Sequence, residues 1–320
     1  MGDSMRCPVC GSDSCEVKRE LYDDRYGFKG RYKLVECALC GHRHLDGVFT
    51  DALLKKLYTD YYPRSSFNLE DYRPYTEVGG FRAWFDGENY AAFRWVPENV
   101  RVLDIGCGFG ETLGYHRVRG CDVYGVEADE NIHRVAEKFG YTVHVGLFDP
   151  ELYRPGFFDY VTLDQVMEHT VNPVETLKGV ERVLKPGGVV VLSMPNSNGW
   201  GARLFGKRWI HWHAPYHIQH FTVRSMTMAA QKAGLTMESC RTVTPSVWLH
   251  SQFLHLLTRP EEGRKSVFWS AGKKKSKRLF IIYSIGFVLR KTKLFNLVTR
   301  FFDALKLGDN FIFILRKQAR

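Results

Sequence analysis

Between residues 100 and 193 the chain alternates short apolar segments with segments of helix length, and this alternation restricts the fold more than any other feature. The apolar segments are 102–105, 123–127, 142–146, 158–163 and 189–193, and the helix-length segments are 111–119, 131–139 and 174–184. Strands that alternate with helices form a parallel sheet wound on both faces, and ligands bind at the carboxyl ends of its strands. The pattern therefore predicts a doubly wound α/β fold with a ligand site after its first strands.

A glycine turn follows the first of these strands and indicates what the site binds. It reads Gly-Cys-Gly-Phe-Gly, and Glu111 stands in place of the third glycine of a dinucleotide-binding turn. This spacing favours a nucleoside ligand without a pyrophosphate group. Asp104 at the strand tip can accept a hydrogen bond from a cationic amine, and Glu127 at the end of the next strand can accept both hydroxyls of a ribose. The ligand-binding residues predicted in this way are Asp104, Gly106, Gly108, Gly110 and Glu127.

From about residue 100 to residue 196 the chain resembles the class I S-adenosylmethionine-dependent methyltransferases. The resemblance rests on VLDIGCGFG (102–110), the acid Glu127, DYVTLDQVMEH (159–169) and LKPGG (184–188). It implies S-adenosylmethionine as cofactor, with Asp149 near the adenine and with Asp164 and Gln165 near the methionine portion. It also implies a Rossmann-like sheet of seven strands, in which residues 310–315 form an antiparallel last strand beside residues 235–243.

Two Cys-x-x-Cys pairs precede this region: Cys7 with Cys10, and Cys37 with Cys40 after 26 intervening residues. Two thiolates at positions i and i+3 share one metal ion, and two such turns complete a tetrahedral four-sulfur zinc site. Four cysteine ligands leave no open position for a substrate, so the pattern predicts structural zinc in a ribbon formed by residues 1–50. Residues 51–99, which are rich in aromatic side chains, are expected to form a helical connector packed against the next domain.

Histidines cluster after the fifth predicted strand, in WIHWHAPYHIQHFT (209–222). Methyl transfer to a hydroxyl benefits from a base, and histidine titrates in the useful range. We therefore nominate His217 and His220 as catalytic residues, followed by His169 beside the cofactor strand. The pattern P-x-H-x-x-H-F-T (215–222) resembles bacterial methyltransferases with an N-terminal zinc ribbon, many of them associated with sugar or surface-polysaccharide pathways. Packing within a lid is the alternative for each histidine, and a histidine metal site is not adopted because the segment has no nearby carboxylate.

Positive charge is concentrated at the C-terminal end. Residues 264–320 carry 15 Lys and Arg against two acids, a net charge of +13, whereas the whole chain carries +10. Residues 244–308 are expected to be an insertion between the last two strands, with a lysine-rich run at 273–278 and an apolar run at 279–289. A predicted helix follows, with Leu294, Leu297, Val298, Phe301, Phe302 and Leu305 on one face and Asn296, Thr299, Arg300 and Asp303 on the other.

An apolar face bordered by basic residues suits a helix that lies on an anionic membrane, here over residues 273–305. A helical cap on the sheet is the alternative. The longest apolar run has 11 residues, against about 20 for a spanning helix, and the chain does not begin with a secretory signal. A cytoplasmic protein is therefore expected, with a peripheral position on the inner face of the membrane if residues 273–305 bind lipid rather than cap the sheet.

These observations predict a zinc ribbon (1–50), a connector (51–99) and a methyltransferase domain (100–320). The expected activity is S-adenosylmethionine-dependent methyl transfer to a small or lipid-linked glycan acceptor, with a sugar hydroxyl as the leading candidate. A lipid-quinone-type O-methyltransferase, an RNA or nucleotide methyltransferase and a non-catalytic zinc-ribbon adaptor are the alternatives. A nucleic-acid partner is not favoured, because the Asn-Pro-Pro-aromatic motif of base-amine methyltransferases is missing from the sequence.

Overall fold

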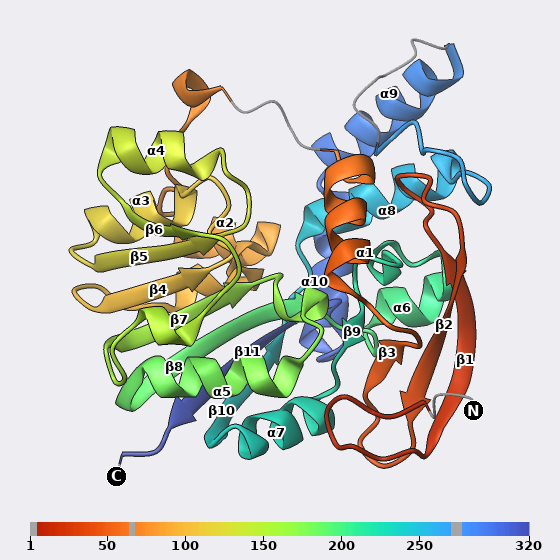
Figure 1. Ribbon diagram of the computed structural model, residues 1–320. Coiled ribbons are helices and arrows are strands. Elements are labelled where there is room, and N and C mark those ends of the chain that lie inside the picture. The colour runs from red at the N-terminus through yellow and green to blue at the C-terminus, as the bar shows by residue number, and fades with distance from the viewer. Residues whose placement is uncertain (1–4, 64–67, 270–276, 320) are drawn as a thin grey trace.

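A seven-stranded mixed sheet forms the larger part of the molecule (Figure 1). The computed structural model describes residues 5–63, 68–269 and 277–319. The strand order is β10-β11-β8-β7-β4-β5-β6; β11 runs antiparallel to both of its neighbours, and the other pairs are parallel. The strands are β4 (Arg101–Ile105), β5 (Asp122–Glu127), β6 (Thr142–Val145), β7 (Phe158–Asp164), β8 (Leu184–Pro195), β10 (Leu235–Thr242) and β11 (Asn310–Lys317). This order confirms the predicted doubly wound sheet and its antiparallel last strand.

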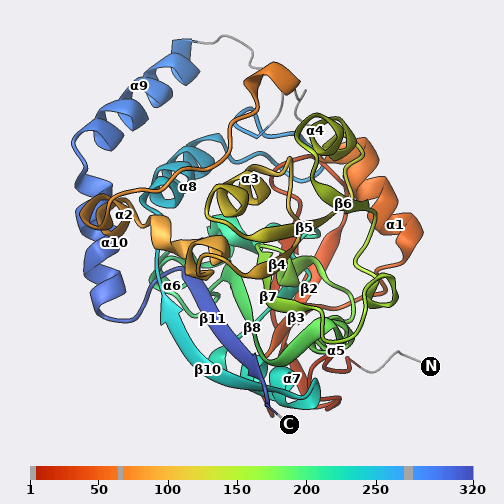
Figure 2. The same cartoon turned by 90° about the vertical axis from the view of Figure 1, so that its left-hand side faces the viewer.

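Helices cover both faces of this sheet, which explains why its central strands are apolar throughout. On one side lie α3 (Glu111–Val118) and α4 (Ile132–Phe139), and on the other lie α5 (Pro173–Val183) and α7 (Val223–Lys232), as Figures 1 and 2 show. Val102, Leu103 and Ile105 of β4 are all buried, as expected for a strand covered on both sides.

The main apolar core continues from this sheet into the cysteine-containing turns. It joins strand residues to α5 and α7 and then to the ribbon, and it includes Leu103, Leu163, Leu177, Val180, Leu192, Ala229, Cys7, Cys37 and Cys40. The ribbon is therefore packed onto the larger sheet through shared side chains.

A second, four-stranded sheet has the order β1-β2-β3-β9 and lies on the right in Figure 1. Its strands are β1 (Cys15–Tyr22), β2 (Arg31–Cys37), β3 (Arg43–Leu45) and β9 (Gln219–His220). The fourth strand belongs to the histidine-rich segment, and its residue His220 pairs with Arg43 of β3. The side chain of Gln219 also bonds the ring of His42 at 2.8 Å. The N-terminal segment thus holds the histidine-rich segment by sheet pairing.

Between β10 and β11, the described residues include three helices along one edge of the molecule, next to α2 (Figure 2). They are α8 (Ser246–Thr258), α9 (Lys277–Lys291) and α10 (Leu294–Ala304), and α2 spans Gly80–Asp86. In the described parts of the chain, none of the helices has the length and apolar character that crossing a bilayer requires. The lysine-rich run predicted at 273–278 lies mostly outside the described residues.

The sequence of α10 was compatible with either a membrane-surface helix or a helical cap on the sheet. The orientation of α10 in the structure differs from that of a helical cap. A cap would turn its apolar face toward the protein. In the structure the polar residues Asn296, Thr299 and Arg300 are buried, and Leu297 and Phe301 are exposed. The physical reason is a set of hydrogen bonds between the polar face of α10 and its neighbours, which pattern alone does not reveal.

Candidate functional site

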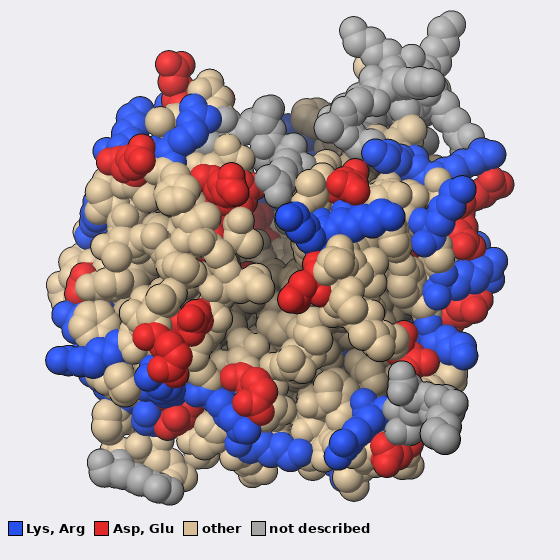
Figure 3. Space-filling model, in the orientation of Figure 1, with Lys and Arg blue, Asp and Glu red and all other residues tan. Residues whose placement is uncertain are grey.

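The carboxyl ends of the parallel strands point toward the second sheet, and the molecular surface is hollowed between the two sheets (Figures 1 and 3). The glycine turn after β4 lies at these ends. Gly106, Gly108 and Gly110 have φ angles of +79°, +57° and +84°, which favour glycine. A Cβ atom at Gly106 would lie 2.5 Å from Cγ2 of Val166, so the turn passes directly beside the loop that follows β7.

Glu127 stands next to the glycine turn, at the end of β5. Its Oε2 accepts a hydrogen bond from the Gly108 amide at 2.9 Å, and its Oε1 accepts one from the Asp129 amide at 2.9 Å. The carboxylate is half-buried, and a Cβ atom at Gly108 would meet only the end of the Glu111 side chain. This side of the turn is therefore open enough for a ligand to reach Glu127.

Asp104 is buried at the tip of β4 and is bonded within the protein. Its Oδ2 accepts from the Thr112 hydroxyl, and its Oδ1 accepts from the Thr162 hydroxyl at 2.6 Å. Burial raises the pKa of Asp104 to about 6, and the two hydroxyl bonds oppose that rise. The Asp104 carboxylate thus links β4 to α3 and β7 beneath the turn by hydrogen bonds. The predicted bond to a cationic amine of a ligand would be made in addition to these.

Asp149 follows β6 and Asp164 is the last residue of β7, so both lie toward the same edge of the sheet. Asp149 is exposed and accepts from the Glu151 amide at 2.9 Å. One oxygen of Asp164 accepts from the Ala92 amide at 2.9 Å, and the other is buried and has no hydrogen-bond partner in the described part of the chain. Burial raises the pKa of Asp164 to about 7. Asp164 therefore offers an unused oxygen at the strand ends.

Gln165 has a φ angle of +56°, an uncommon conformation for a residue with a side chain. Its side-chain amide donates to Ser193 Oγ at 2.7 Å and to Asn310 Oδ1 at 2.9 Å, and these bonds anchor it to β8 and β11. The backbone is thereby fixed where the chain turns from β7 toward the histidines.

Three side chains after this turn form a compact group, which we call the Glu-His-His trio: Glu168, His169 and His217. Their ligand-type atoms all lie within 4.8 Å of one another. His169 Nδ1 bonds the Tyr216 carbonyl at 2.9 Å, and His217 Nδ1 bonds the His211 carbonyl at 2.9 Å. A carbonyl only accepts, so each Nδ1 carries the ring hydrogen and each Nε2 keeps a lone pair. Both histidines are thus arranged as proton acceptors.

Burial keeps the trio electrically neutral near pH 7. Glu168 is 1% exposed, and among the described residues neither of its oxygens has a hydrogen-bond partner. Burial raises the pKa of Glu168 to about 8, lowers the pKa of His169 to about 4 and holds that of His217 well below its ordinary value. Perturbed, clustered groups of this kind are typical of sites that move protons.

His220, nominated together with His217, lies outside the trio. It is 1% exposed, and its ring centre is 6.4 Å from that of His217. Its nearer aromatic neighbour is Trp212, with ring centres 5.0 Å apart. The pairing of β9 with β3 places His220 in the four-stranded sheet.

Two members of the site escaped the sequence reasoning. Glu168 supplies the carboxylate that the histidine segment lacks. A histidine metal site was not adopted because no carboxylate was nearby, and Glu168 removes that objection. The trio has the spacing of ligands for one divalent cation. Tyr58, in the short helical turn after α1 (Asp51–Lys56), brings its hydroxyl to 2.9 Å from His169 Nδ1. The sequence signal for Glu168 was its position directly before the nominated His169. No sequence signal indicated Tyr58.

The four predicted zinc ligands come together. Sγ of Cys7 lies 3.6 Å from Sγ of Cys40, Sγ of Cys10 lies 3.4 Å from Sγ of Cys37, and all four sulfurs lie within 4.8 Å. Zinc bonded to sulfur at about 2.3 Å in a tetrahedron separates the sulfurs by about 3.8 Å. The donor set and its spacing therefore fit one zinc ion.

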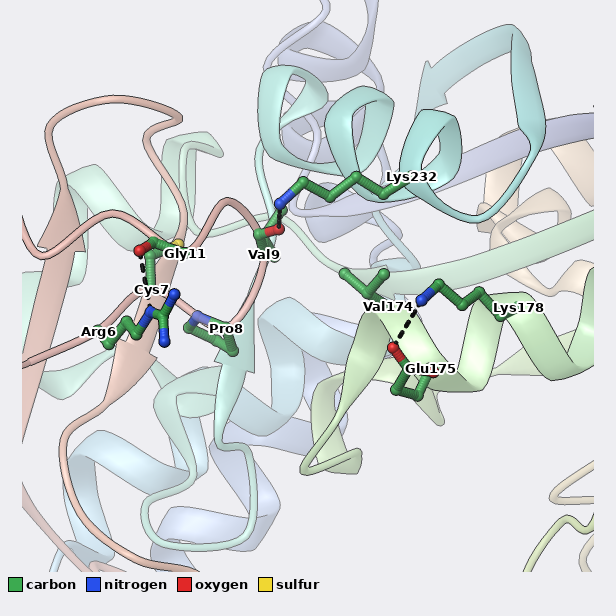
Figure 4. A pocket seen from close by; sticks show the side chains of 9 residues that line it. All are labelled: Arg6, Cys7, Pro8, Val9, Gly11, Val174, Glu175, Lys178 and Lys232. Carbon is green, nitrogen blue, oxygen red and sulfur yellow. Dashed lines mark hydrogen bonds and ion pairs between the residues drawn. The ribbon is translucent and has the colours of Figure 1, made fainter.

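A lysine from α7 holds the first cysteine turn in place. Lys232 Nζ donates to the carbonyls of Val9 at 2.9 Å and Cys10 at 3.0 Å, and Figure 4 shows the side chain reaching across to Val9. The groove drawn there is lined by the first cysteine turn, by α5 and by Lys232, and its lining does not include the Glu-His-His trio.

Comparisons with known proteins agree with this geometry. A family model described as a methyltransferase domain matches residues 76–239. A ubiquinone biosynthesis O-methyltransferase of Azoarcus sp. is 32% identical over 136 residues, which cover 40% of this chain and 56% of that protein. One of the same name from Dechloromonas aromatica is 36% identical over 117 residues, covering 32% of this chain and 50% of that protein. This chain thus spans about half the length of these curated relatives.

A solved structure with a similar fold is phosphoethanolamine N-methyltransferase 2 of Haemonchus contortus in complex with S-adenosylmethionine. The match has a TM-score of 0.50 and 19% identity, and it covers 87% of this chain and 62% of that one. At this identity the likeness concerns the fold alone.

Proposed function

The chain belongs to the methyltransferase-domain family, and on that premise we propose that it transfers a methyl group from S-adenosylmethionine to an oxygen atom of a lipid-quinone-type acceptor. The observation that carries the proposal is the Glu-His-His trio, which begins two residues after Val166, the residue that meets the glycine turn at Gly106. The relatives named ubiquinone biosynthesis O-methyltransferases support this acceptor over the sugar hydroxyl that led the sequence-based expectation.

In this proposal the cofactor occupies the open side of the glycine turn. S-adenosylmethionine, when bound, supplies a sulfonium methyl group that an oxygen nucleophile takes in line. Glu127 accepts hydrogen bonds from the ribose hydroxyls, and the exposed Asp149 lies on the adenine side. Asp164 directs its unused oxygen toward the methionine portion, and Gln165 positions the backbone that carries it.

The trio removes the proton of the acceptor. The proton of the acceptor hydroxyl would pass to Nε2 of His217 or His169 as its oxygen takes the methyl group that bound S-adenosylmethionine would supply. Above its raised pKa of about 8, the carboxylate of Glu168 would stabilise the positive charge on the imidazole. Tyr58 orients His169 as a positioning residue. His220, buried behind His217, is assigned a supporting role.

Zinc has a structural role in this proposal. A zinc ion that is bound by all four cysteines has no open coordination position for a substrate. By fixing the N-terminal sheet, the ion also fixes β3, which pairs with β9 in the histidine-rich segment. The ribbon thereby sets the position of the acceptor side of the site.

Calorimetric titration with S-adenosylmethionine tests the cofactor assignment. Glu127→Ala removes both predicted bonds to the ribose and is expected to weaken binding by at least about a hundredfold, because hydrogen bonds to a charged group contribute about 1.5–3 kcal/mol each. Glu130→Ala is the matched control, since Glu130 is an exposed acid three residues further on. Equal affinities of wild type and Glu127→Ala would remove Glu127 from the site.

A further inference from the structure

An apolar stripe of α10 faces solvent and its polar side faces the protein, while Phe302 beside the stripe stacks on Trp200. The exposed side chains recur at intervals of three and four residues, as one stripe along a helix does. They are Leu294, Leu297, Phe301 and Leu305, with exposed fractions between 49 and 61%. The buried side chains of the opposite face are Asn296, Thr299 and Arg300. A surface helix of an isolated protein normally has the reverse arrangement.

Hydrogen bonds fix α10 in this orientation. Asn296 donates to Asp86 Oδ1 at 2.6 Å and to the Phe85 carbonyl at 3.1 Å, both at the end of α2. Thr299 shares a hydrogen bond with Ser246 of α8 at 3.0 Å. Turning the apolar stripe inward would break these bonds and leave buried polar groups unpaired.

The charged residues of the same face are also paired. Arg300 forms an ion pair with Asp303 at 2.7 Å and donates to the carbonyls of Trp84 and Thr244. Asp303 accepts in turn from the Thr244 amide at 2.9 Å. These bonds oppose rotation of α10 about its axis, so its apolar stripe stays exposed to solvent.

Two neighbouring helices extend this apolar surface along the edge seen in Figure 2. α9 rests on α8 at Gly286, where a Cβ atom would lie 2.8 Å from the ring of His250. Its exposed apolar residues are Phe280, Ile281, Ile285, Phe287 and Val288, and those of α2 are Phe81 and Trp84. We call the exposed residues of α2, α9 and α10 the apolar edge.

We propose that the apolar edge is a docking surface for an anionic lipid bilayer, with α9 and α10 lying in the headgroup region. Residues 273–306 contain ten Lys and Arg and a single acid, Asp303, which is already paired with Arg300. Among the described side chains of this stretch, Lys291, Lys293 and Lys306 are exposed. An apolar surface within a basic stretch matches an anionic interface, which draws basic residues to its surface. Two copies of this chain would instead bring like charges together.

The position of the apolar edge relative to the trio fits this partner. α8 carries both α9 and α10, and its Trp248 lies against the ring of His211, with ring centres 3.9 Å apart. The carbonyl of His211 accepts the bond from His217. Docking would thus place the membrane one helix away from the acceptor side of the site. The proposal stands apart from the proposed function, because it needs neither cofactor binding nor turnover.

Co-sedimentation with vesicles tests the proposal on the full zinc-loaded chain. Vesicles of phosphatidylcholine with about a third phosphatidylglycerol should bind the protein at low salt and release much of it at high salt. Phosphatidylcholine alone should bind it much more weakly. Equal binding to both vesicle types, or no binding to either, would overturn the proposal.

A matched pair of double variants locates the surface. Leu297→Asp with Phe301→Asp should weaken binding to anionic vesicles by at least about tenfold, since it removes two apolar side chains from the interface. Val48→Asp with Val118→Asp changes two apolar residues elsewhere that are at least as exposed, and it should bind like wild type. Equal binding of both double variants would overturn the assignment to the apolar edge.

The alternative occupant, a second copy of the chain, has its own signature. Light scattering in the absence of lipid should give a monomer for wild type. A dimer that Leu297→Asp with Phe301→Asp converts to monomer would replace the bilayer with a second copy as the occupant. S-adenosylmethionine affinity within about twofold of wild type shows that the variants are folded, because Leu297 and Phe301 touch solvent and not the cofactor loop.

Discussion

Replacing Gly106 with alanine adds one methyl group at the tightest point of the candidate cofactor site. A left-handed conformation costs an L-residue about 1–2 kcal/mol, and Gly106 has a φ angle of +79°. The new Cβ atom would lie 2.5 Å from Val166 Cγ2, and such overpacking costs a further 1–3 kcal/mol or so. We therefore expect Gly106→Ala to lower the free energy of unfolding by about 2–5 kcal/mol, measured by urea denaturation followed by circular dichroism.

Two further variants separate the two costs. Gly140 has a φ angle of +65° and no heavy atom within 4 Å of its added Cβ position, so Gly140→Ala should lose only about 1–2 kcal/mol. Combining Gly106→Ala with Val166→Ala relieves the contact, so the two substitutions should show a favourable coupling of about 1–3 kcal/mol in a double-mutant cycle. Equal losses for Gly106→Ala and Gly140→Ala, together with zero coupling, would refute the close approach of the two loops.

Three further predictions concern the zinc site and the trio. Cys37→Ser should lose the zinc ion in elemental analysis of the purified protein, whereas Cys15→Ser should retain it; zinc loss in both would contradict the four-ligand assignment. The pKa of Glu168 is raised by burial from 4.5 to about 8, so the folded state holds a proton that the unfolded state releases, and the free energy of unfolding should fall as pH rises through this range. Glu168→Gln should remove that slope in urea titrations, and an unchanged slope would show that another group causes it. Tyr58→Phe should slow methyl transfer several-fold without changing S-adenosylmethionine affinity, because His169 loses one of its two Nδ1 contacts; an unchanged rate would remove Tyr58 from the site.

The sequence predicts the larger sheet closely because local patterns determine it. Parallel strands covered on both faces read as apolar runs, and the glycine turn has a spacing that is informative by itself. The four cysteines were also recognisable, because their spacing reflects one coordination geometry. These features need only neighbouring residues to be read.

The parts that sequence did not reveal depend on contacts between distant residues. The two-residue strand β9 is too short to show a pattern, yet it joins the histidine segment to β3. Glu168 reads as an ordinary acid until the fold buries it beside His217. The amphipathic pattern of α10 identified its two faces but not which one the neighbouring helices would bind, because that choice rests on hydrogen bonds such as the one between Asn296 and Asp86.

The most direct test of the proposed function is the transfer of a radiolabelled methyl group from S-adenosylmethionine to acceptors held in anionic vesicles. One acceptor is a dihydroxybenzene with a long alkyl tail, which is the reduced form of a lipid quinone, and the other is a glycolipid with free sugar hydroxyls. We expect label on the dihydroxybenzene oxygen, little on the glycolipid, and a loss of transfer in Glu168→Ala with cofactor affinity retained. Label on the glycolipid, or on neither acceptor while the cofactor is bound, would contradict the proposed function.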